Sequence, residues 1–463
     1  MSTPPAATDK PAPAEKKADE PSKPPRNLFR RFVFSVPGIF IVLVLVLAGA
    51  GAWLFLAPVP YNQALFNEIE QRFRCDVPAD QNGYHDYAKI KDVDASLVPS
   101  LADDIRAMAS GALGKTFDNK LYQATWNQQA GQKALWDRAM SREQSRCDFP
   151  LDLSPDAPLA TLDMARLVRL RLLATVDNAD TYLATVRAMR HLIRMLTDRG
   201  SVVHAALGTV YAADLVNVTA AHLSIARANL TIDRLKQLDT EFDGLDTALL
   251  ASQESLEAEF AGSVFAIKAD AAAGSFPANV YIGAAVSRLA RYVEVLITVE
   301  RDARAMNNAE WRSQPSVDPA TALSGFENFR MMIHRPLIET ARPIYRGMVE
   351  QIRATATRVR LLRLALRICA WSAANGGKLL PDLDTLNVNP IGPPQIVDEW
   401  AGDAPYQYAQ LSPEGGKSGF QLGSVGADGT WDGWPGEAAV DASAGDHIAM
   451  SDAARPWLIV PAR

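Results

Sequence analysis

The chain has 463 residues, of which 48% are hydrophobic and 22% are charged, and its formal net charge is -6. This mildly acidic balance excludes the basic surface that nucleic-acid binding requires. The length is enough for two or three domains that each bury a core. We therefore expect a globular protein that does not bind nucleic acid.

The N-terminal part predicts a tail followed by a membrane span. Residues 1–31 are rich in Pro, Lys, Ala and Ser and have no apolar periodicity, which is typical of a disordered segment. Residues 32–57, from Phe32 to Ala57, contain no charged side chain. Because a helix rises about 1.5 Å per residue, this stretch is long enough to cross a hydrocarbon core of about 30 Å. We predict a transmembrane helix over residues 32–57.

The charges that flank this span predict its orientation. Lys and Arg side chains precede it, whereas Glu68 and Glu70 are the first charges after it, so the N-terminus is expected in the cytoplasm. In an alternative reading, Ile39 to Leu47 is the apolar core of a secretory signal that is cleaved near Ala48. The apolar run continues beyond that point, which favours an uncleaved anchor. Both readings export the rest of the chain.

Two cysteines lie in similar local sequences, each preceded by Arg and followed by Asp, a hydrophobic residue and Pro. These are Cys75 and Cys147, and an oxidising compartment would favour a disulfide between them. Two separate thiols are the alternative, because sequence spacing does not establish the geometry of a disulfide. Cys369 lies in an apolar helical run and is interpreted as a core residue.

Residues 58–352 predict an exported domain that is a helical bundle or array. Apolar side chains recur there at helical spacing, and no short internal repeat indicates a solenoid. Thr231 is a plausible helix N-cap, and Gly200, Gly274 and the Pro-bearing segment 314–319 predict breaks. The expected helices cover 118–146, 162–197, 202–228, 232–242 and 286–305.

Residues 353–463 predict a separate small module. A basic, apolar helix is expected over 353–374 and should end at Gly376 and Gly377. Its arginines, which are Arg358, Arg360, Arg363 and Arg367, are interpreted as an internal salt-bridged face. Short strands are expected at 404–408 and 419–425, with a turn between them. The fold class is therefore mainly α, with a small α+β module at the C-terminus.

The order of motifs in this module resembles the C-terminal part of the major pseudopilins of bacterial type II secretion systems. The matching residues are Asn375-Gly376-Gly377, Pro381, Leu383 to Leu386, Asp398-Glu399-Trp400, Pro405 to Tyr408 and Ser424 to Gly429. The resemblance covers roughly 100 residues and implies a helix packed on a small sheet. Similar tails end longer bacterial envelope proteins. The chain departs from a pilus subunit because no pilin processing site appears and about 300 residues separate the span from the module.

The pseudopilin resemblance also implies calcium in the final loop. That loop contains four carboxylates beside glycines, namely Asp428, Asp432, Asp441 and Asp446. Hard oxygen ligands suit Ca²⁺. The spacing is not that of an EF-hand, and turns also use Asp beside Gly, so plain turn residues are the alternative.

No catalytic motif emerges from the sequence. The six histidines, which are His85, His191, His204, His222, His334 and His447, form no zinc-ligand spacing, and there is no nucleophile elbow or phosphate-binding loop. The acid pairs Asp103 with Asp104 and Glu257 with Glu259 are interpreted as solvated faces.

We expect an inner-membrane protein with a periplasmic body that acts through contacts with envelope proteins. An exported hydrolase and a lipid or small-ligand carrier are the alternatives.

Overall fold

A computed structural model describes part of the chain, in two compact units that divide between Ala57 and Pro58. The described residues are 36–91, 93, 101, 103–105, 119–142, 144–147, 162–226, 230–273, 278–313, 322–323, 342–387, 389–392, 394–402, 404–411, 419–426 and 457–460. The first unit contains helix α2, Val36–Leu56, and all other described elements belong to the second unit, here called the body.

The body is mainly helical, as the sequence predicts. Its α-helices are α3 Gln63–Phe73, α4 Gly83–Tyr87, α6 Asn119–Gln128, α7 Ala130–Ser141, α8 Leu162–Thr175, α9 Ala179–Thr197, α10 Val202–Ile225, α11 Ile232–Phe242, α12 Leu245–Ala251, α13 Ser255–Ala273, α14 Ala278–Ala305, α15 Asn308–Ser313 and α18 Arg342–Ala374. Short 3₁₀ turns occupy η4 Ser252–Glu254 and η6 Leu383–Asn387. The helix expected over 232–242 is confirmed, and Thr231 caps it by accepting the backbone N–H of Arg234.

Several predicted boundaries were wrong because local caps and breaks were missed. The stretch 162–197 is two helices, since the Asn178 side chain accepts the N–H groups of Asp180 and Thr181 and starts α9 there. The stretch 118–146 is likewise two helices that part at Gln129. Helix α18 begins at Arg342, so the proposed domain boundary after residue 352 lies inside it. The domain division otherwise stays a prediction.

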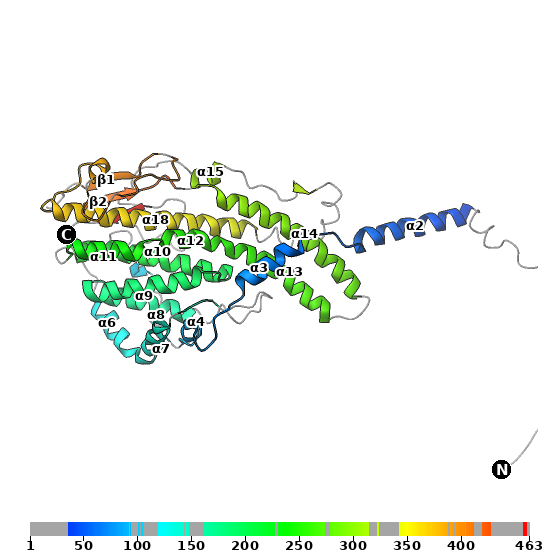
Figure 1. The fold of residues 1–463 in the computed structure, drawn as a ribbon, viewed down its shortest axis with the longest axis horizontal. Coiled ribbons are helices and arrows are strands. Elements are labelled where there is room, and N and C mark those ends of the chain that lie inside the picture. The colour runs from blue at the N-terminus through cyan, green and yellow to red at the C-terminus, as the bar shows by residue number, and fades with distance from the viewer. Residues whose placement is uncertain are drawn as a thin grey trace, which may run out of the picture. The chain divides into compact units, whose positions relative to one another are not determined.

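Helix α10 lies at the centre of the body and packs on α8, α9, α13 and α18 (Figure 1). The contact with α9 is close because Gly208 has no side chain. A Cβ at Gly208 would lie 2.8 Å from Thr197 Cγ2. The described apolar segment of α2, Ile39–Gly49, is shorter than a membrane span. By length and composition together, Val202–Leu223 of α10 is the one helix in the described regions that is long and apolar enough to cross a membrane, and 61% of an 18-residue window in it is buried inside the body. Such burial is typical of a core helix.

A small antiparallel sheet lies near the C-terminus. Strand β1, Gln407–Leu411, pairs with β2, Gly419–Gly423, and β2 also pairs with β3, Trp457–Val460. The sequence predicted β1 and β2 to within three residues and did not predict β3. Both β2 and β3 contact α18, whose end is set by Gly376 and Gly377 with positive φ angles of 68° and 83°.

Candidate functional site

The chain that follows α2 is fixed to the body at several points. The backbone N–H of Val59 donates to Ser287 Oγ over 3.0 Å, and that of Asn62 donates to Glu294 Oε2 over 3.1 Å. In α3, the ring of Phe66 packs edge-on against Phe265 with 6.2 Å between ring centroids. Because Ser287 and Glu294 both belong to α14, these contacts hold the start of the body against that helix.

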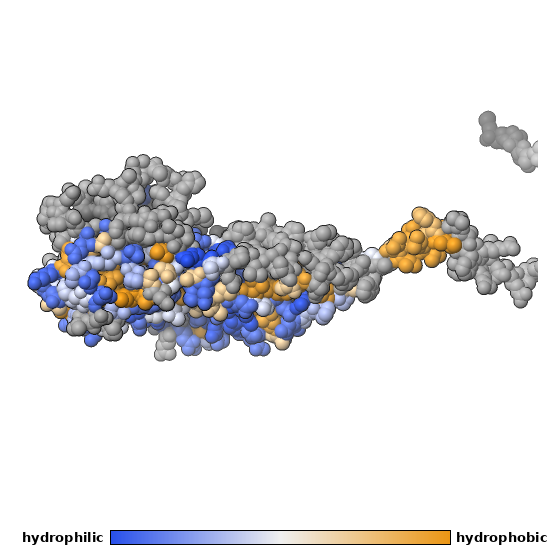
Figure 2. Space-filling view, turned by 90° about the horizontal axis from the view of Figure 1, so that it is seen from above, coloured by the Kyte–Doolittle hydropathy of each residue, from blue (hydrophilic) through white to orange (hydrophobic). Residues whose placement is uncertain are grey.

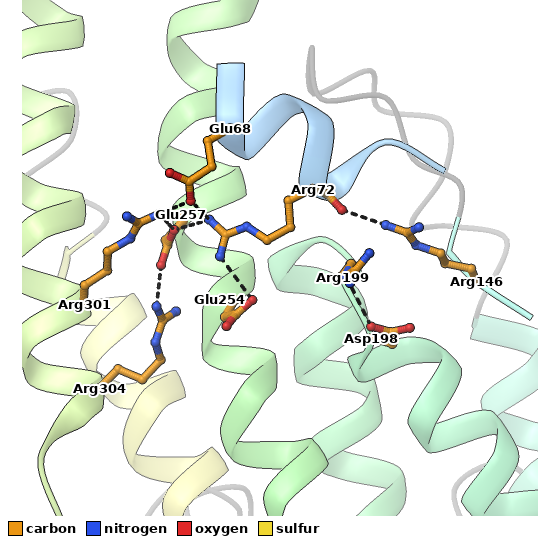
Figure 3. A network of polar contacts seen from close by, with 9 residues as sticks. All are labelled: Glu68, Arg72, Arg146, Asp198, Arg199, Glu254, Glu257, Arg301 and Arg304. Atoms are coloured by element: carbon orange, nitrogen blue, oxygen red, sulfur yellow. Dashed lines mark hydrogen bonds and ion pairs between the residues drawn. The ribbon is translucent and has the colours of Figure 1, made fainter. Parts of the chain in front are cut away.

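A buried carboxylate, Glu257 on α13, is the centre of an ion-pair cluster that includes Arg72 of α3. Its side chain is 1% exposed, and it accepts bonds from Arg72 on α3 at 2.8 Å and from Arg301 and Arg304 on α14 at 2.7 and 2.6 Å. Figure 3 shows the three guanidinium groups converging on it from two helices. We call these four residues the Glu257 cluster. It ties the first helix of the body to α13 and α14.

Two further carboxylates bring the cluster close to electrical neutrality. Glu68 pairs with Arg72 and Arg301, and Glu254 pairs with Arg72. Burial by itself would raise the pKa of Glu257, but the hydrogen bond from Arg301 and the charges of Arg304 and Arg72 lower that pKa below its ordinary value. A carboxylate held ionised by three cations is suited to joining helices and is a poor general acid or base. The interpretation of Glu257 as part of a solvated face is wrong.

A second ionic interface joins α18 to α11 and α12. Arg360 pairs with Asp246 at 2.7 Å and with Glu399 at 2.5 Å, and both Arg363 and Arg367 pair with Asp239, at 3.0 and 3.2 Å. The predicted internal salt-bridged face of this helix is therefore confirmed at Arg360, Arg363 and Arg367, whereas Arg358 donates to the Asn217 amide oxygen. Carboxylates of the body neutralise Arg360, Arg363 and Arg367, so these three side chains are unavailable to an anionic lipid or phosphate.

The motif residues of the C-terminal module come together around Asp398, which is 1% exposed. Its carboxylate accepts the Ser424 hydroxyl at 2.7 Å and the backbone N–H groups of Val425 and Trp400 at 2.9 and 3.1 Å. Burial raises the pKa of Asp398, and these hydrogen bonds act in the opposite direction. The Asp398 side chain therefore connects the segment that contains Trp400 to the segment that begins at Ser424.

Trp400 attaches this module to the helices. Its indole is fully buried, donates to Thr357 Oγ1 of α18 over 2.9 Å, and lies edge-on to Trp311 of α15 with 6.1 Å between ring centroids. The Trp400 carbonyl also accepts a bond from Arg312 at 2.9 Å. The module and the two helices thus share one packed contact.

The structure brings the two cysteine segments together, although Cys75 and Cys147 are present as thiols. The Asn82 amide donates to Cys75 Sγ over 3.6 Å and to the Arg146 carbonyl over 2.8 Å, and it accepts the Arg146 N–H. The Cys147 thiol faces the Met195 carbonyl at 3.3 Å. The same side chain therefore bonds Cys75 and the residue before Cys147, and the disulfide stays a prediction.

In an oxidising compartment we expect Cys75 and Cys147 to form this disulfide after Cys147 turns away from Met195. Peptide mapping by mass spectrometry without reduction should find the linked peptide. Replacing both cysteines with Ser should lower the free energy of unfolding by up to about 4 kcal/mol, since a long loop is no longer closed. Cys369→Ser is the control and should change it little. Alkylation of both thiols in exported protein without prior reduction would contradict the prediction.

Two described histidines of the helical core, His204 and His222, are hydrogen-bonded and buried, whereas His191 is half-buried. His204 contacts Ser201 Oγ at 2.7 Å and the Tyr84 hydroxyl at 3.0 Å, and His222 stacks on Tyr182 with 4.1 Å between ring centroids. Burial lowers the pKa of both His204 and His222 to about 4. His191 contacts Ser145 at 3.1 Å. The burial of His204 and His222 fits a structural role better than catalysis, since a substrate has no access to a fully buried imidazole.

The four proposed calcium ligands, Asp428, Asp432, Asp441 and Asp446, lie outside the described residues, so calcium binding there stays a prediction. Among the residues that the structure does describe, no group of three or more His, Cys, Asp or Glu side chains is arranged to hold a metal ion. Asp104, from the other acid pair, accepts the Tyr122 hydroxyl, and Asp103 is exposed.

Comparisons of the chain with protein-family models, with curated proteins and with solved structures gave no match.

Proposed function

We propose that this protein is a single-pass membrane protein of the bacterial envelope, with a cytoplasmic N-terminus and a periplasmic body, and that it acts through protein contacts. Helix α2 carries the proposal. Its 21 residues would span about 32 Å, and all nine large side chains from Ile39 to Leu47 are apolar and 39% to 65% exposed. Figure 2 shows this helix as a continuous hydrophobic surface. Lipid is the environment in which such a surface is stable.

The contacts at the start of the body support an anchoring role for α2. Only Ala57 and Pro58 separate the end of α2 from Val59, whose N–H is bound to Ser287. The Glu257 cluster then fixes α3 to α13 and α14. The chain that leaves α2 therefore enters a firmly packed part of the body, which suits a protein that α2 holds at the membrane.

The C-terminal module is the surface that we propose binds a partner, a protein of secretion or envelope assembly. Its resemblance to pseudopilins, which work by assembling with other proteins, supports this assignment. Strand β1 lies at the edge of the described sheet, and its Gln410 side chain is exposed. Edge strands offer backbone N–H and C=O groups to a partner segment. The gathering of motif residues around Asp398 supports a single folded module.

Photo-crosslinking in intact cells tests the binding role. A photoreactive amino acid at position 410 of the full chain should give a discrete adduct with another envelope protein. The same group at Leu121, which is exposed on α6, is the matched control and should not give that adduct. Adducts at 121 but not at 410 would move the binding surface to the helices. The absence of protein adducts at both positions would contradict a function based on protein contacts.

A further inference from the structure

A cavity of about 170 Å³ lies where the helical part of the body meets the C-terminal sheet. The end of α10, the first turns of α11, the end of α18 and strand β2 all contribute to it. The large apolar side chains of its described lining are Leu223, Leu230, Leu235, Ile368, Leu379 and Phe420. No charged side chain belongs to the described lining, so an ion placed there would lose its hydration without compensation.

One polar side chain in this cavity is unusual. Ser372 lines it and is 6% exposed, yet its hydroxyl makes no hydrogen bond within the described part of the chain. Other helical hydroxyls near it in sequence do make such bonds, as Thr357 Oγ1 donates to the Arg353 carbonyl over 3.0 Å. No hydrogen bond to the described residues occupies the Ser372 hydroxyl, so it can bond to a molecule in the cavity.

The size and lining of the cavity define what would fit. A cavity of about 150 Å³ lined by apolar side chains holds a benzene molecule, so this one has room for about six to eight non-hydrogen atoms. The apolar walls favour a neutral molecule, and the Ser372 hydroxyl offers it one hydrogen bond. We propose that the cavity is a binding site for a small neutral, largely apolar molecule that carries one hydrogen-bonding group, of the size and character of phenol.

This assignment is independent of the anchor and of the partner surface proposed above. A molecule in the cavity would contact α11, α18 and β2 together, because each contributes lining residues. The cavity exists only while β2 packs on the helices. A ligand that binds there therefore shifts the equilibrium between packed and separated sheet toward the packed state. We expect the backbone amides of β2 to exchange hydrogen more slowly when the cavity is filled.

Equilibrium titration of the full chain in detergent micelles with phenol and with benzene tests the assignment. We expect saturable binding of one phenol per chain with a dissociation constant on the order of 1 mM or tighter, given the few atoms available for contact. Ser372→Ala should weaken phenol binding about five- to tenfold and leave benzene binding unchanged, because only phenol uses the hydroxyl. Ser263→Ala, whose hydroxyl bonds the Phe260 carbonyl, is the matched control and should change neither.

A filled cavity provides the second test. Leu235→Phe should abolish saturable binding of both molecules while circular dichroism remains that of the parent, and Leu223→Phe serves if the first variant fails to fold. Binding that persists in the folded, filled variant would show partition into micelles or another site and would overturn the proposal. No saturable binding by the parent, or equal loss of phenol and benzene in Ser372→Ala, would overturn it as well.

Discussion

Glu257→Gln is expected to lower the free energy of unfolding of the body by about 3 kcal/mol. The amide keeps the size of the side chain but leaves Arg72, Arg301 and Arg304 without the charge on which they converge. Removing one partner from a buried ion pair costs about 3 to 5 kcal/mol. The lower end applies because the three arginine side chains are 22%, 33% and 24% exposed and retain contact with water. Urea unfolding of the full chain in micelles measures the change.

Glu254→Gln is the matched control for this variant. Among the described residues Glu254 pairs only with Arg72, at 3.3 Å, and it is 36% exposed, so its loss should cost less than about 1 kcal/mol. Equal effects of the two variants would show that the Glu257 cluster does not hold α3 in place.

The effect of Glu257→Gln should also depend on pH. Because the folded-state pKa of Glu257 lies below its ordinary value of 4.5, its stabilisation is present above about pH 4.5 and is lost as the pH falls through the folded-state pKa. The difference in unfolding free energy between parent and variant should therefore be largest near neutral pH and should shrink in acid. A difference that grows on acidification would contradict the assignment of an ionised Glu257.

Trp400→Ala should lower the free energy of unfolding of the body by a similar amount. Truncating a fully buried Trp costs about 3 to 5 kcal/mol, and here it also removes the packing on Trp311 and the bond to Thr357. We expect the sheet to separate from α18 before the helices unfold. Hydrogen exchange read by mass spectrometry should show faster exchange in β1 and β2 than in α9 and α10.

Thr357→Val separates the hydrogen bond from the packing. This variant keeps the shape of the Thr357 side chain but leaves the buried Trp400 indole N–H unpaired, which should cost about 1 to 3 kcal/mol. Unchanged exchange of β1 and β2 in Trp400→Ala would contradict the role of Trp400 as the attachment between module and helices.

The sequence was most informative where a single local signal decides the structure. Thr231 marked the start of α11, glycines marked the end of α18, and the acidic partners expected for the arginines of α18 are present on α11 and α12. It was least informative about long-range polar contacts. Nothing around Glu257 distinguishes it from Glu259, because the three arginines that bury it come from distant parts of the chain.

Two other features depend on tertiary packing in the same way. Ser372 lies in an ordinary helical pattern, and only the packing of α11 and β2 beside it creates a cavity. The Asn82 side chain bonds both Cys75 and Arg146, and this contact joins segments that are about 70 residues apart. The similar sequences around Cys75 and Cys147 were the one signal for this contact, and that signal did not predict how the two cysteines lie relative to each other.

Protease digestion of spheroplasts that contain the full chain tests the membrane assignment most directly, with an epitope at the N-terminus and a second one on the body. We expect the body to be degraded while an N-terminal fragment ending near residue 60 stays protected and remains in the membrane pellet after an alkaline wash. A body that resists protease until the membrane is lysed, or a fragment that the alkaline wash releases, would contradict a single span with a cytoplasmic N-terminus.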